Sequence, residues 1–137
     1  MKIHADKTEG QPPHALSVRA VRCILAGVPA SWIEGMAGVR LANSLDGAPE
    51  AWFNRYDRTL TIRSRGCTPK KALEAILFEL AAVDAGYAKR RWHQISARES
   101  SRVRKVIAPL VEELLPVVTP PKKRFVTEPT PAFRRVV

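Results

Sequence analysis

The sequence predicts a single small α+β domain, and three observations lead to this prediction. Apolar residues recur at helical spacing in several segments, residues 59–63 alternate strictly, and glycines and prolines separate these segments. The chain has 137 residues, of which 45% are hydrophobic, so one core of moderate size can form. The expected order is an N-terminal helix, a small mixed or antiparallel sheet of about three strands, a long central helix and a kinked C-terminal helix.

The N-terminal part of the chain combines a polar stretch with a helix. Residues 1–13 are polar and are broken by glycine and proline, which predicts a flexible leader. Residues 15–26 have apolar side chains at helical spacing and end at Gly27, a common residue at helix ends. A short helical turn is expected over residues 30–36.

The hydrophobic period changes after this turn. Residues 39–43 suit a strand, because Val39, Leu41 and Asn43 alternate with Arg40 and Ala42, and residues 51–53 form a second short strand candidate. The clearest alternation is at residues 59–63, where Leu60 and Ile62 share one face. These three segments predict the sheet.

A long helix follows the sheet. Thr68 can cap its free N–H groups, and Pro69 suits the first helical position. The pattern continues to Ala85 and stops at Gly86. Apolar residues occupy two sides of this helix, which predicts a central rather than a surface position.

The last predicted element is a helix that starts at Ser100 or Ser101. Pro109 interrupts its apolar pattern and predicts a kink or a break, because proline has no N–H to donate. Pro116 is expected to end the helix. The single domain is therefore predicted to span residues 14–118.

The net charge of +10 is concentrated in two segments. Residues 87–105 carry a net +6 and the tail, residues 119–137, carries +4. The tail has several prolines and no periodicity, so it is predicted to be disordered. Basic patches attract nucleic acids or acidic proteins, and the alternative is a merely solvated surface. The candidate anion-binding or nucleic-acid-binding residues are Lys89, Arg90, Arg91, Trp92, Arg98, Arg102, Arg104 and Lys105.

The order of elements, with the segments GVP, GMAGVRLA, YDRTLTI and ALEAILFELAAVDAG, resembles a small zincin-type metallopeptidase core over roughly residues 15–100. In that family the long helix carries HExxH, whose histidines bind zinc and whose glutamate is the general base. Here Phe78 and Ala82 stand at the two histidine positions, and Glu79 is the vestigial glutamate. The resemblance implies a degenerate domain without metal. Ordinary core packing of Phe78 and Ala82, with Glu79 in a salt bridge or facing solvent, is the alternative.

The sequence thus predicts a non-catalytic, zincin-like binding or scaffold module that has no cofactor. The alternative is a nucleic-acid-binding protein that uses residues 87–105 and the tail. An active enzyme with a polar cleft around Glu79 is the third possibility. Cys23 and Cys67 lack the spacing of a metal or redox motif, and no targeting segment or membrane span is visible. A cytoplasmic location without a membrane partner is therefore expected.

Overall fold

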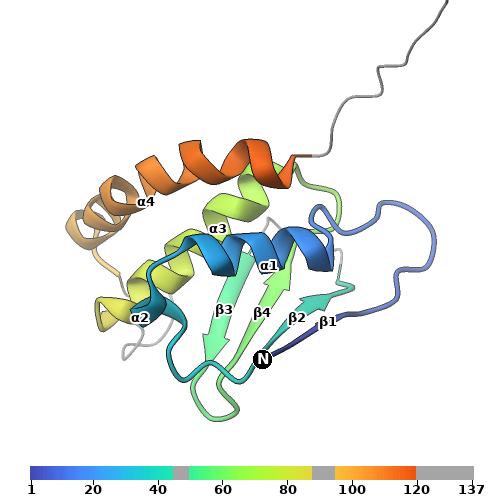
Figure 1. Ribbon diagram of the computed structural model, residues 1–137, viewed down its shortest axis with the longest axis horizontal. Coiled ribbons are helices and arrows are strands. Elements are labelled where there is room, and N and C mark those ends of the chain that lie inside the picture. Colours follow the sequence, from blue (N-terminus) through green and yellow to red (C-terminus); the bar gives the residue numbers. More distant parts are fainter. Residues whose placement is uncertain (45–49, 88–94, 120–137) are drawn as a thin grey trace, which may run out of the picture.

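The computed structural model describes residues 1–44, 50–87 and 95–119 of the chain. These residues form three layers (Figure 1). A sheet forms the first layer, helices α1 (Val18–Gly27) and α3 (Pro69–Asp84) cover one of its faces, and α4 (Ala97–Val118) packs on both helices. The α+β fold predicted from the sequence is confirmed, and the structure adds that the two long helices, α3 and α4, pack together.

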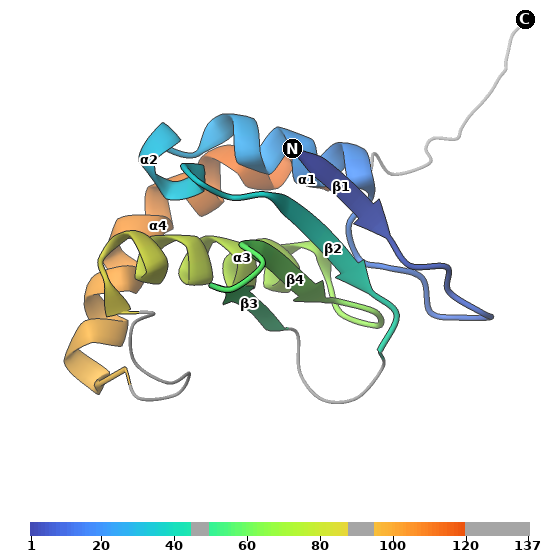
Figure 2. The same cartoon turned by 90° about the horizontal axis from the view of Figure 1, so that it is seen from below.

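The sheet is mixed and has four strands instead of the predicted three or so. β1 (Lys2–Ala5) pairs in parallel with β2 (Gly38–Ala42), and β2 pairs in parallel with β4 (Thr59–Arg63). β3 (Glu50–Asn54) runs antiparallel to β4. The strand order β1-β2-β4-β3 leaves β1 and β3 at the two edges (Figure 2).

The additional strand β1 lies within the predicted flexible leader, so the structure differs from the prediction there. Its end is fixed by Asp6, whose N–H donates to the carbonyl of Leu41 at 2.9 Å. The carboxylate of Asp6 also pairs with Arg40 at 2.7 Å, and this guanidinium lowers the pKa of Asp6. A strand of four residues gives almost no periodic signal of its own, and pairing with β2 is what orders it.

Helix α3 is central, as its two-sided apolar pattern predicts. The hydroxyl of Thr68 accepts a hydrogen bond from the N–H of Lys71 at 3.2 Å, which caps the helix start. Contacts with β3, β4 and α4 surround the helix. Its buried residues are Ala72, Leu73, Ile76, Leu77, Leu80, Ala81 and Ala82.

Helix α4 differs from its prediction at both ends. It begins after Ser96, which forms a capping box with Glu99, and it continues through Pro109 and Pro116 to Val118. Both prolines are exposed, so the hydrogen bonds that they remove lie on the solvent side of the helix. The buried stripe on the other side packs against α1 and α3, and this packing maintains the helix.

The short helix α2 (Ala30–Ile33) confirms the turn expected after the first helix. It packs against α3. Trp32 is its buried residue, with 8% of its surface exposed. This contact closes one end of the helical layer near β3 (Figure 1).

Candidate functional site

Glu79 lies between α3 and the edge strand β3. Its side chain is half-buried, and Oε2 accepts a hydrogen bond from the N–H of Phe53 at 2.8 Å. This N–H is therefore not donated to β4. The carboxylate takes the place that a carbonyl of a further strand would occupy, so it satisfies part of the open edge of the sheet.

The environment of Glu79 changes its acidity. Burial raises the pKa of Glu79, and the negative charge of nearby Glu50 raises it further. The N–H of Phe53 acts in the opposite direction, but the net result is a raised pKa. A half-buried carboxyl with a raised pKa is common among general acids and bases, yet structural carboxyls share the same property. The hydrogen bond from the N–H of Phe53 indicates that the Glu79 carboxylate has a structural role, which is to join α3 to β3.

Phe78 and Ala82, the two positions that the sequence comparison set against zinc ligands, lie in packed surroundings. Phe78 is half-buried and has the guanidinium carbon of Arg104 5.9 Å from its ring centroid. Ala82 is 1% exposed. Phe78 thus contacts α4, whereas Glu79 contacts β3. In the described parts of the chain, no group of three or more His, Cys, Asp or Glu residues is arranged to hold a metal ion.

The basic candidates on α4 divide into two groups. Arg98, Arg102 and Lys105 are exposed, and their spacing of four and three residues places them on one face of the helix. We call these three residues the α4 basic row. Arg104 lies outside the row, because it contacts Phe78 and its Nε donates to the hydroxyl of Ser100 at 3.3 Å.

The α4 basic row lies opposite the buried side of the helix. On a helical wheel, the three cations point away from the buried stripe, which consists of Val103, Ile107, Val111, Leu114 and Val118. The remaining candidates, Lys89, Arg90, Arg91 and Trp92, fall outside the described residues, as does nearly all of the tail.

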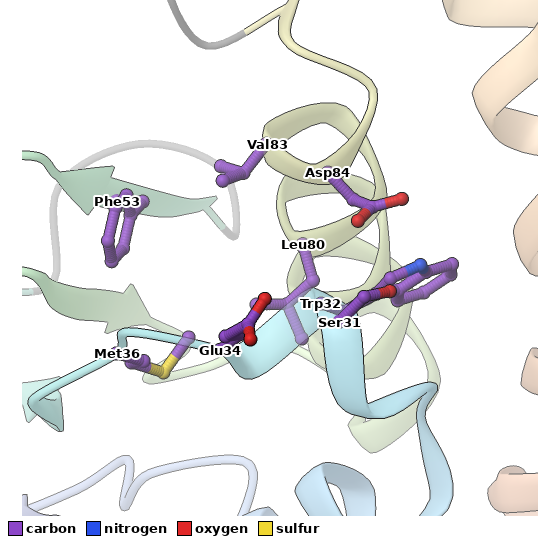
Figure 3. A pocket seen from close by; sticks show the side chains of 8 residues that line it. All are labelled: Ser31, Trp32, Glu34, Met36, Phe53, Leu80, Val83 and Asp84. Atoms are coloured by element: carbon purple, nitrogen blue, oxygen red, sulfur yellow. The ribbon is translucent and has the colours of Figure 1, made fainter.

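A small pocket lies where α2, β3 and α3 meet (Figure 3). Its volume is about 260 Å³, and its lining residues are Ser31, Trp32, Glu34, Met36, Phe53, Leu80, Val83 and Asp84. The lining is mainly apolar, and Glu34 and Asp84 are exposed acids. These carboxylates repel phosphates, so the pocket does not suit a nucleic acid. Sequence reasoning missed it because three separate elements build it.

Within the described ranges, no helix is both long and apolar enough to cross a bilayer. Comparisons of the chain with known protein families, curated proteins and solved structures found no match.

Proposed function

We propose that this chain is a non-catalytic binding domain and that its α4 basic row holds a nucleic acid by contacts with phosphates. The observation that carries the proposal is the position of Arg98, Arg102 and Lys105 on one exposed face of α4. The row spans residues 98–105, or roughly 10 Å of helix. Along the axis of a duplex each strand carries one phosphate per roughly 3.4 Å, so a row aligned with that axis spans about three of them.

The stability of α4 does not explain this row. Arg98 lies in the first turn of α4, where a cation opposes the helix dipole at a cost of roughly 0.3–1 kcal/mol, and Arg102 and Lys105 lie in later turns, where the dipole has little effect. Among the described residues, none of the three cations has an ion-pair partner. The carboxylate of Glu99 accepts from the N–H of Ser96 at 2.9 Å, so it serves the cap. Exposed cations that are not neutralised attract polyanions over long distances.

The chemistry around Glu79 supports the non-catalytic part of the proposal. The phenyl ring of Phe78 and the methyl group of Ala82 have no donor atom for zinc, so the zincin-like frame has lost both ligands. Glu79 is bonded to the backbone of Phe53. On this proposal, the zincin-like layout serves as a scaffold that carries a binding surface.

Charge reversal on α4 tests the proposal. The double variant Arg98→Glu/Arg102→Glu should bind a generic 20-base-pair duplex about tenfold more weakly, or worse, at low salt, because phosphate contacts dominate such binding. Fluorescence polarisation of a labelled duplex measures the effect. The variant should remain folded in thermal melts, because both replaced side chains are exposed and a glutamate at position 98, in the first turn, favours the helix dipole.

The matched control is Arg19→Glu/Arg22→Glu, which reverses two exposed arginines on α1 and changes the net charge equally. This control should lose much less affinity. Equal losses in the two double variants would show that only net charge matters. Absence of duplex binding at low salt would reject duplex nucleic acid as the partner of the α4 basic row. Binding of an acidic protein through the same three residues would then be the remaining interpretation of the row.

A further inference from the structure

We infer that the open face of the sheet binds single-stranded nucleic acid by stacking a base on Trp52. This inference goes beyond the proposed function, because it assigns a second surface and a type of strand. The helices all lie on the other side of the sheet, with α4 outermost (Figure 1). Of the described elements, none covers the face that carries Trp52.

The strand register defines this face. Ala51 and Phe53 pack against the core, so the alternation of β3 places Trp52 on the opposite side. The same side holds one continuous row across all four strands, which consists of His4, Arg40, Thr61 and Trp52. We call this set the open-face row. It lies at right angles to the strands and runs for about 14 Å, given a strand spacing of about 4.8 Å.

Two large aromatic residues are exposed, one on β3 and one in the turn that follows it. Trp52 has 37% of its surface exposed, and Tyr56 in the turn is 100% exposed. An exposed indole ring on the open face of a sheet makes few contacts with the core, and its flat face is accessible for stacking. Stacking on aromatic rings is how sheets bind unpaired bases, and it tolerates any base.

Two arginines follow β3 in the chain. Arg55 and Arg58 lie in the same turn as Tyr56, and the guanidinium of Arg58 donates to the carbonyl of Gly35 at 3.2 Å. Asp57 is the acid of this turn, and its carboxylate accepts from the N–H of Thr59 at 3.0 Å. On the face itself, Glu50 lies two residues from Trp52 and pairs with Arg63, and Asp6 pairs with Arg40, so those charges nearly cancel. The turn after β3 keeps an excess of one positive charge, because Arg55 and Arg58 outnumber Asp57.

Exposed aromatic rings next to cations favour one class of ligand for the open face over the others. A duplex hides its bases and leaves no face to stack on Trp52. A neutral oligosaccharide could stack on the ring, but it would not use the cations. An acidic peptide would use the cations, but it would not need an exposed indole. A single strand uses both, because each nucleotide offers a phosphate and an accessible base.

The test compares a labelled 15-nucleotide oligothymidylate with a duplex of 15 base pairs, using the full chain and fluorescence polarisation. Trp52→Leu should weaken binding of the single strand by about tenfold, because one stacked base contributes about that much. Binding of the duplex should change by less than about twofold. Trp52→Phe keeps a ring and should retain single-strand affinity to within about threefold. Thermal melts confirm that both variants fold.

The outcomes separate this inference from the proposed function. If Trp52→Leu weakens only the single strand while Arg98→Glu/Arg102→Glu has no effect on the duplex, the open face binds and the α4 basic row does not. If Trp52→Leu leaves single-strand affinity unchanged, the inference is wrong whatever α4 does. A shift of the Trp52 indole NMR signal with a neutral oligosaccharide, but not with oligothymidylate, also overturns it.

Discussion

Leu77→Ala is expected to lower the free energy of unfolding by about 2–5 kcal/mol. Leu77 is 0% exposed and lies on α3, which packs between the sheet and α4. Truncation removes buried methyl groups and leaves a cavity that the surrounding elements can only partly fill. Alanine favours helix at least as much as leucine does, so the loss reports packing and not helix propensity. For a domain with a total stability of about 5–15 kcal/mol, this is a severe loss.

Urea denaturation followed by circular dichroism measures this effect. The control is Val106→Ala on α4, where the side chain is 54% exposed. We expect a change of less than about 0.5 kcal/mol for this surface substitution. If Leu77→Ala were as harmless as Val106→Ala, α3 would not be the centre of the core.

Glu79→Ala is expected to destabilise the protein at neutral pH by about 1–3 kcal/mol. The substitution removes the acceptor for the N–H of Phe53 and leaves that donor without a protein partner. It also removes methylene groups from the contact between α3 and β3. Glu79→Gln is the informative comparison, because its amide oxygen can accept the same hydrogen bond while the side chain carries no charge.

The pH dependence of Glu79→Gln follows from the raised pKa of Glu79. The folded protein protonates this carboxyl at a higher pH than the unfolded chain does. Its ionisation therefore costs stability above the folded pKa, and this cost disappears as the pH falls below the ordinary carboxyl range. At pH 7, Glu79→Gln should be as stable as wild type or more stable. The difference between the two proteins should shrink as the pH falls.

Urea denaturation of wild type, Glu79→Gln and Glu79→Ala at several pH values between neutral and acid tests this sign. Other carboxyls, such as Asp6, titrate equally in wild type and in Glu79→Gln, so their contribution cancels in the difference. An advantage of wild type over Glu79→Gln at pH 7 that vanishes in acid would contradict the prediction. It would mean that the Phe53 hydrogen bond outweighs burial of the charge.

The elements that the sequence predicted well have local signals. The strong capping residue Thr68, the Pro69 that follows and the long apolar pattern identify α3. The alternation of residues 59–63 identifies β4 in the same way. In both cases the same residues determine the local conformation and the buried face, so local reasoning is sufficient.

The predictions that differ from the structure concern features that depend on distant contacts or on competing local signals. Strand β1 depends on its pairing with β2, which no local pattern reveals. The start of α4 was missed although Ser96 and Glu99 have the spacing of a capping box. Pro109 was expected to kink or break the helix; α4 is not broken there, because the exposed position of Pro109 makes the lost hydrogen bond tolerable.

The candidate surfaces were predictable only in part. The excess of cations in residues 87–105 was visible in the sequence, but the separation of Arg104 from the α4 basic row required the position of Phe78. Residues 51–53 were predicted to form a strand. The face on which Trp52 lies became clear only from the pairing of Trp52 with Thr61 and of Thr61 with Arg40. Register and topology are long-range properties, and one sequence does not specify them locally.

The salt dependence of duplex affinity tests the proposed function most directly. Each phosphate contact contributes roughly 0.9 to the slope of log affinity against log salt concentration. Arg98→Gln/Arg102→Gln/Lys105→Gln should therefore make the slope shallower by about 2–3, without preference for any duplex sequence. An unchanged slope in this triple variant, or no duplex affinity of wild type at low salt, would contradict the assignment of the α4 basic row.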